Sequence, residues 1–165
     1  MTDWYTKSRE AVKRIYGQDW KLFCGLLSAT SATMSVKANA TKARRVYDNY
    51  KATGTISREG LMSSHYKSCL KVVETGKPGG RKCQSFYQNL IGNETPVTVD
   101  VWIMRLCGLK GKQPTKKQYD QIEAEIQSQA EQLGITPAQL QAQLWVQARG
   151  DSSGYDTELR QRRLF

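Results

Sequence analysis

Hydrophobic residues recur every three or four positions along most of the chain, which is the spacing of amphipathic helices. Alternating hydrophobic and polar residues, the pattern of a strand, occur only in the run VTVDV at residues 97–101. That run is too short for a sheet, and we interpret it as an extended lead-in to a helix that starts near Asp100. The pattern therefore predicts an all-α fold.

The predicted helices follow one another with short polar connectors. Stripes that begin at Trp4 and Trp20 give the first two helices, and the Ser- and Thr-rich connector SATSATMS precedes a third over about residues 36–50. We expect a fourth helix to open at Ser57 as its N-cap and to end at Gly76. The remaining helices are predicted over about residues 81–91, 101–109 and 116–133, and after Thr136-Pro137, a cap followed by proline at the first helical position.

The chain length is sufficient for one domain with its own core. A chain of 165 residues can bury hydrophobic side chains without help from metals or disulfides. We expect residues 1–150 to form a single helical domain and residues 151–165 to form a polar C-terminal tail. The tail is polar with an apolar end, so it either packs back on the body or stays loose.

Positive charge is concentrated in the first half of the chain. The net charge is +10; residues 1–82 contain 16 Lys and Arg against 6 Asp and Glu, whereas residues 83–165 contain 9 of each. A one-sided excess attracts polyphosphate and binds it in a salt-dependent way. DNA, RNA and an acidic protein all fit this charge, and so does an ordinary solvated surface.

The composition argues against several other classes of protein. The four cysteines, Cys24, Cys69, Cys83 and Cys107, lie 45, 14 and 24 residues apart, so no CxxC pair is available for a zinc ion or an iron-sulfur cluster. We expect reduced, mostly buried thiols and no cofactor. No hydrophobic run approaches the roughly 20 residues of a membrane span, and the N-terminus lacks a signal-peptide core. These features predict a soluble protein of the cytoplasm or nucleoid.

The segment KPGGRK at residues 77–82 has the composition of a turn that contacts an anion. Gly79 and Gly80 allow the backbone to turn tightly and to approach a ligand, and N–H groups at the start of the next helix can hold a phosphate. Arg81 or Lys82 would strengthen that hold. An ordinary helix–helix turn is the alternative, and a glycine pair alone favours it.

From this turn onward the chain resembles the helix-hairpin-helix DNA glycosylase superfamily. Pro78 to Lys82 correspond to the family's hairpin, and Val99-Asp100 correspond to the Val-Asp pair that opens its next helix. Lys82 lies 18 residues before Asp100, as in the lyase-competent branches, which include the endonuclease III-like and archaeal 8-oxoguanine glycosylase-like enzymes. The run VDVWIMRL is similar to the family's Asp-x-His-x-x-Arg segment, with Trp102 in place of the histidine.

The resemblance extends over about residues 20–150, and its specific part is Lys82 to Arg105. The connector GLLSATSATMSVKANATKA and the late helix PAQLQAQLWVQAR also look like segments of the family. Three features depart from it: the hairpin is one residue shorter than usual, the cysteine cluster of endonuclease III is missing, and the chain is smaller than typical members. The small size would suit a phage-encoded member.

The resemblance implies a helix-hairpin-helix glycosylase-like bundle that acts as a monomer on double-stranded DNA. Such an enzyme flips a damaged or modified base into a pocket and cleaves its glycosidic bond. Asp100 would stabilise positive charge on the sugar or deprotonate the attacking group, and Lys82, its pKa lowered by neighbouring cations, would form a Schiff base that leads to strand cleavage. The implied DNA contacts are Lys77, Gly79, Gly80, Arg81, Lys110 and Lys112, and the base-pocket or stacking residues are Trp102, Gln84 and Tyr87. No metal is implied.

Each assignment has a structural alternative. Asp100 could be only a helix N-cap, and Lys82 could be only a phosphate contact. His65, the one histidine, lies among hydrophobic residues and is expected to be structural. At the level of the whole protein, the alternatives are an enzyme that remodels a hypermodified base in phage DNA and a non-catalytic helix-hairpin-helix DNA-binding protein.

Overall fold

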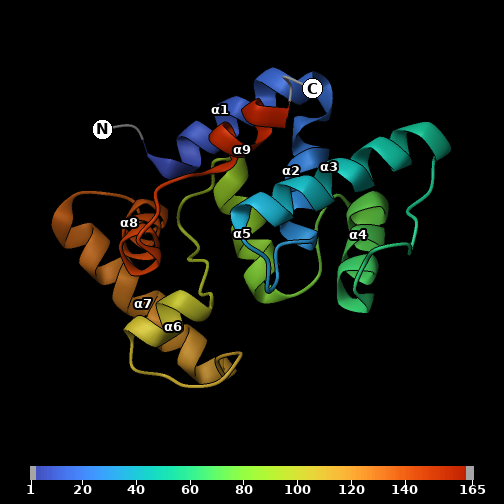
Figure 1. The fold of residues 1–165 in the computed structure, drawn as a ribbon. Coiled ribbons are helices and arrows are strands. Elements are labelled where there is room, and N and C mark those ends of the chain that lie inside the picture. The colour runs from blue at the N-terminus through green and yellow to red at the C-terminus, as the bar shows by residue number, and fades with distance from the viewer. Residues whose placement is uncertain (1–2, 163–165) are drawn as a thin grey trace.

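The computed structural model describes residues 3–162, and all the regular structure within that range is helical (Figure 1). The all-α prediction is therefore confirmed for this part of the chain. The elements are α1 (Trp4–Tyr16), the 3-10 helix η1 (Gly17–Asp19), α2 (Trp20–Ala29), α3 (Val36–Thr53), α4 (Ser63–Thr75), α5 (Arg81–Ile91), α6 (Val101–Leu106), α7 (Lys116–Leu133), α8 (Pro137–Arg149) and α9 (Tyr155–Arg162).

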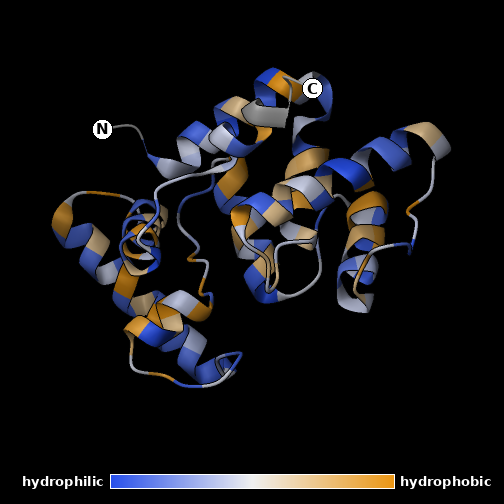
Figure 2. Cartoon of the chain, in the orientation of Figure 1, coloured by the Kyte–Doolittle hydropathy of each residue, from blue (hydrophilic) through white to orange (hydrophobic). Residues whose placement is uncertain are grey.

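The helices form two groups, which we call the first group (α1–α5 and α9) and the second group (α6–α8) (Figure 1). The first group encloses a core that includes Val12, Phe23 and Leu90, and the second packs around Ile103 and Ile122. Helix α8 contributes to both cores and so lies between the groups. Hydrophobic and polar residues alternate along the helices in Figure 2, as expected for elements with one buried face.

A close contact between α2 and α4 sets the position of the turn at residues 76–80. A Cβ atom at Gly25 would lie only 2.7 Å from Val72 Cγ1, so the helices approach at a point where only glycine fits without a shift. Leu26, Cys69 and Val72 are buried in the same contact. The glycine therefore helps to fix α4, and with it the turn that leads into α5.

Local signals placed most helix ends correctly, but the start of α4 was predicted wrongly. We expected Ser57 to be the N-cap, whereas the helix begins at Ser63. The Ser57 hydroxyl instead accepts a hydrogen bond from the N–H of Glu59, only two residues on, at 3.1 Å. Serine commonly closes such turns in competition with helix formation, and Gly60 at φ +72° prolongs the irregular segment.

The predicted tail contains a helix that packs on the body. In α9, Tyr155 is 3% exposed and Leu159 is fully buried, and the helix lies against α1 and α3 (Figure 1). The Arg44 guanidinium on α3 donates a hydrogen bond to the Leu159 carbonyl at 2.9 Å. Of the two possibilities for the tail, packing back is the one observed for residues 155–162, and residues 163–165 lie outside the described range.

Replacing Leu159 with alanine should destabilise the fold by about 2–5 kcal/mol, because it leaves a cavity in a fully buried site. Thermal unfolding followed by circular dichroism would measure the change. Leu133→Ala is the matched control: Leu133 is 64% exposed, so its truncation should cost less than about 0.5 kcal/mol. Equal melting temperatures for the two variants would mean that α9 does not pack on the body in solution.

The described residues contain no helix that is both long and apolar enough to cross a membrane. The four cysteines are free; Cys24 and Cys69 are buried, Cys83 is half-buried and Cys107 is exposed. Three of the four thiols are thus at least partly removed from solvent, in agreement with the expectation of mostly buried cysteines.

Candidate active site

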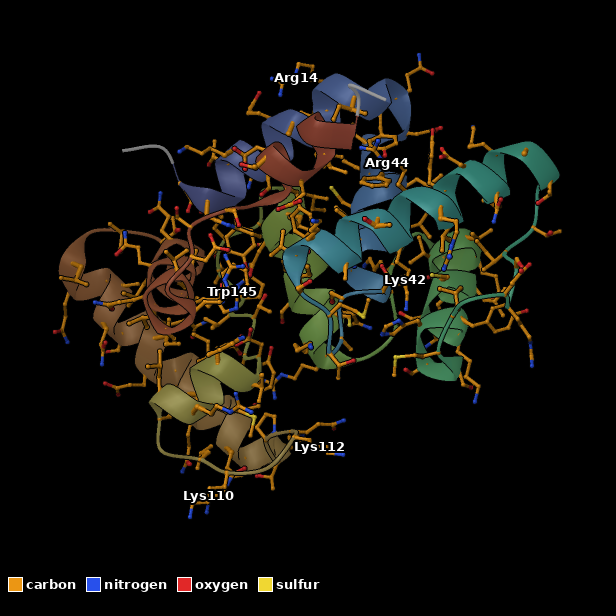
Figure 3. The ribbon with its side chains drawn as sticks, viewed as in Figure 1. Arg14, Lys42, Arg44, Lys110, Lys112 and Trp145 are labelled. Carbon is orange, nitrogen blue, oxygen red and sulfur yellow. The ribbon has the colours of Figure 1, made fainter. Side chains whose placement is uncertain are left out.

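A pocket of about 70 Å³ opens between the two helical groups. Five of its thirteen lining residues are aromatic, namely Trp4, Tyr5, Phe86, Trp145 and Tyr155. The Trp4 ring meets the Trp145 ring edge to face, with their centroids 5.1 Å apart, and meets the Tyr155 ring in the same way at 5.6 Å. In Figure 3, Trp145 lies between α8 and the first group. These rings pack on one another as well as lining the pocket.

Lys82 and Asp100 line this same pocket. Lys82 comes from the first turn of α5, and Asp100 is the residue directly before α6. The positive charge of Lys82 acts favourably on the Asp100 carboxylate, yet the two do not form an ion pair in the described structure. The pocket therefore brings an amine and a carboxylate together on one lining.

Asp100 is a helix cap and is also a carboxyl group with an unusual proton affinity. Its Oδ1 accepts a hydrogen bond from the Ile103 N–H at 3.0 Å, which confirms the predicted N-cap. Burial raises the pKa of Asp100 above its ordinary value. The charge of Lys82, the Trp145 indole and backbone N–H groups favour the ionised form but only partly offset burial. Asp100 is therefore a better proton acceptor than a surface aspartate.

The segment before Asp100 is held in an extended form by side chains from both groups. The Tyr119 hydroxyl of α7 donates to the Val97 carbonyl at 2.7 Å, and the Val97 N–H donates to Glu123 Oε2 at 2.9 Å. From the other side, the Thr98 hydroxyl donates to Asn89 Oδ1 of α5 at 2.8 Å. Residues 97–99 form no strand, so the interpretation of VTV as a lead-in to a helix is confirmed.

The sequence of residues 2–152 matches DUF7178, which is described as a family of unknown function. The protein belongs to the DUF7178 family. No curated protein and no solved structure matches it. The DUF7178 match includes α1–α8, and thus Lys82, Asp100 and Trp145, but ends before α9, which supplies Tyr155 to the pocket.

The turn at residues 76–80 offers fewer free N–H groups than the sequence suggests. The Gly79 N–H donates to the Ser68 hydroxyl at 3.0 Å and is therefore occupied. Gly80 precedes α5 at φ +84°, a conformation that favours glycine, and α5 has no side-chain cap. No side chain caps the N–H groups at the start of α5. Uncapped N–H groups are what an anion-binding site at a helix start requires.

Arg81 is already paired with acidic residues of α7. Its Nη1 lies 2.6 Å from Asp120 Oδ1, and its Nη2 lies 3.1 Å from Glu123 Oε1. The guanidinium also stacks over the Tyr119 ring, 4.1 Å from the centroid. In this structure Arg81 therefore connects the first group to the second, and a contact with phosphate would compete with two ion pairs.

The other predicted DNA and base contacts lie away from the aromatic pocket. Gln84 and Tyr87, together with Lys77 and Arg81, line a separate cavity of about 230 Å³. Lys110 and Lys112 are exposed in the loop between α6 and α7 (Figure 3). Trp102 is partly buried on α6, with the Arg105 guanidinium 5.6 Å from the centroid of its ring, and does not line the pocket.

Two pocket residues that the sequence did not single out are Trp145 and Gln141. Gln141 is 3% exposed, and its Oε1 accepts a hydrogen bond from the Tyr5 hydroxyl at 2.7 Å. Both residues lie on α8, beside hydrophobic residues whose spacing predicts only a buried helix face. A tryptophan on this late helix was part of the family resemblance, and it was the only signal that the helix could reach the site.

His65 has the structural role that the sequence suggested. It is 1% exposed, and its Nε2 lies 3.0 Å from the Ala32 carbonyl oxygen. Burial lowers the pKa of His65, and the nearby charges of Lys42 and Lys82 lower it further. The imidazole is therefore neutral at pH 7 and is not among the residues that line the pocket.

Proposed function

We propose that this protein is a DNA N-glycosylase of the helix-hairpin-helix type with abasic-site lyase activity. The observation that carries the proposal is the meeting of Lys82 and Asp100 in one aromatic pocket. These are the two residues whose spacing resembles that of the lyase-competent glycosylases. In this reading, α4, the turn at residues 76–80 and α5 form the helix-hairpin-helix element.

The pocket is the proposed site for a flipped base. A base cannot be attacked inside a duplex, and turning it out costs a few kcal/mol, least for a damaged or mismatched base. The aromatic walls would contact the planar face of the base. Gln141, whose oxygen is engaged by Tyr5, would use its amide N–H groups to bind a carbonyl oxygen at the edge of the base.

The chemistry assigned to the pair begins with a proton transfer. Asp100, with its raised pKa, accepts a proton from the Lys82 ammonium, and the free amine attacks C1′ of the sugar. A bond forms between Nζ and C1′ while the glycosidic bond breaks, and its electron pair leaves with the base. The second proton on Nζ passes to the departing base, and Asp100 returns its proton to O4′ as the C1′–O4′ bond opens to give an iminium ion. The Asp100 carboxylate then removes a proton from C2′, and the 3′-phosphate leaves with the electron pair of the C3′–O bond.

The distribution of charge supports a nucleic-acid substrate. The excess of Lys and Arg lies entirely in residues 1–82, which include α1–α4, the turn before α5 and the first two residues of α5. Lys77, Lys110 and Lys112 are exposed away from the pocket, where their side chains would be able to contact phosphate groups of a duplex. Positive charge of this kind contributes affinity without base specificity, which leaves recognition of the base to the pocket.

Borohydride trapping tests the proposal directly. The protein would be incubated with duplexes that carry an abasic site, uracil, 8-oxoguanine, an oxidised pyrimidine or a hydroxymethylated base, and the iminium ion would be reduced to a stable adduct. We expect a covalent protein–DNA adduct on the abasic duplex and on the duplex with the preferred base. If neither an adduct nor a released base appears while duplex binding persists, the protein is a non-catalytic DNA-binding protein.

A further inference from the structure

Glu123 and Tyr119 on α7 each contact both the segment before Asp100 and Arg81, the residue next to Lys82. Glu123 uses Oε2 to accept from the Val97 N–H at 2.9 Å and Oε1 to pair with Arg81 at 3.1 Å. Tyr119 uses its hydroxyl to bind the Val97 carbonyl and its ring face to stack under the Arg81 guanidinium. The same two side chains therefore contact both the segment that carries Asp100 and the residue next to Lys82.

Arg81 completes a continuous connection between the two halves of the candidate site. It is the first residue of α5 and directly precedes Lys82. Both ends of its guanidinium fork form ion pairs, one with Asp120 at 2.6 Å and the other with Glu123. A planar fork held at two points and stacked on a ring has little freedom to move. The start of α5 is thereby tied to α7, and through α7 to residues 97–99.

We infer that Arg81 is a positioning residue that fixes the Lys82 amine relative to the Asp100 carboxylate, instead of a phosphate contact. Its catalytic consequence rests on the proposed glycosylase function. Displacement of a reacting group by about 1 Å can reduce a rate about a hundredfold. Asp120 and Glu123 would also repel a phosphate brought close to Arg81, so the two acidic partners oppose a direct role in DNA binding.

The inference is tested by variants that separate position from charge. Arg81→Gln removes both the charge and the planar fork of the guanidinium. Arg81→Lys keeps the charge but removes the fork. Glu123→Gln weakens one ion pair of Arg81 without removing a positive charge. Glu131→Gln is the matched control, because Glu131 is an exposed residue of the same helix. Exposed ion pairs contribute little to stability, so all four proteins should fold, as far-UV circular dichroism would check.

The rate of adduct formation on an abasic duplex would be measured in single turnovers with the protein in saturating excess. We expect Arg81→Gln, Arg81→Lys and Glu123→Gln to be slower by about tenfold to a hundredfold. The duplex affinity of Glu123→Gln and the salt dependence of Arg81→Gln should match the wild type, and Glu131→Gln should match it in every respect. If Arg81→Gln instead binds more weakly with a salt slope reduced by about one, while Arg81→Lys and Glu123→Gln react normally, Arg81 is a phosphate contact.

Hydrogen exchange gives a second result that does not depend on activity. The N–H groups of Val97 and Val99 are bonded to Glu123 and Tyr119, respectively. In the free protein, both should exchange faster in Arg81→Gln than in the wild type and at an unchanged rate in Glu131→Gln. Unchanged exchange in Arg81→Gln overturns the inference. If these N–H groups exchange faster in Arg81→Gln but the wild type forms no adduct on any duplex, the connection through Arg81 is supported. In that case only the glycosylase function is rejected.

Discussion

Replacing Asp100 with asparagine should stop base release and at the same time make the protein more stable at neutral pH. Asparagine is as good an N-cap as aspartate, so its amide oxygen can still accept the hydrogen bond from Ile103. What the variant loses is a negative charge in the pocket. In the proposed reaction, the carboxylate that carries this charge accepts the proton of the Lys82 ammonium, and its removal should slow single-turnover base release by about 10²–10³-fold.

The stability gain follows from the direction of the pKa shift. Burial raises the pKa of Asp100 in the folded protein above its ordinary value of 3.8, so the folded state binds this proton more tightly than the unfolded chain. Stability is therefore lost as the pH rises from the unfolded pKa through the raised folded pKa, and the loss persists at pH 7. The Asp100→Asn variant does not lose stability in this way, because asparagine does not ionise.

Melting temperatures of the wild type and of Asp100→Asn, measured between pH 3.5 and pH 7, would check this prediction. The advantage of the variant should be largest at pH 7 and should shrink toward low pH, with each 1 kcal/mol worth roughly 2–4 °C. Asp48→Asn, at an exposed position of α3, is the control and should change neither activity nor stability. A variant that is active, or less stable than the wild type at pH 7, would contradict the role given to Asp100.

Replacing Lys82 with glutamine should eliminate the borohydride adduct. In the proposed reaction, the Lys82 amine becomes the nitrogen of the Schiff base, and no other residue that lines the pocket carries an amine. Glutamine is similar in length and polarity, so the pocket should keep its shape. Adducts on the abasic duplex would be resolved by denaturing electrophoresis, and we expect the band to fall below detection while duplex binding is largely retained.

Lys67→Gln provides the matched control for this loss. Lys67 is an exposed lysine of α4 that does not line the pocket, so its replacement removes the same charge without touching the reaction. Its adduct should form at the rate of the wild type. An adduct that survives in Lys82→Gln would show that another amine is the nucleophile and would leave Lys82 as a phosphate contact.

Features of the fold that depend on local interactions were predicted well from the sequence. Thr136-Pro137 defines the start of α8 because the threonine caps the helix and the proline suits its first position, and the structure shows both together with a reciprocal bond from Gln139. Ser57 misled the prediction because the same hydroxyl can close a turn as readily as it can cap a helix. Tertiary context decides between these outcomes, and a local pattern does not contain it.

The candidate site was predicted only where its residues lie close in sequence. Lys82 and Asp100 were found by their spacing, whereas Tyr5 and Gln141 are hydrogen-bonded partners separated by 136 positions. Each lies in a hydrophobic stripe that indicates only a buried helix face. For the same reason the glycine turn suggested a role for Arg81 in DNA binding, because its acidic partners belong to a helix some 40 residues later.

The pocket draws on both ends of the chain, since Trp4 and Tyr5 come from the first helix and Tyr155 comes from the last. During synthesis the basic first half, with Lys82, emerges well before the helix that supplies Tyr155. A nascent chain can thus expose its positive surface while the aromatic side of the pocket is still incomplete. The aromatic side of the pocket therefore closes only after α9 has been synthesised, and a chain truncated before Tyr155 would leave the pocket open on that side.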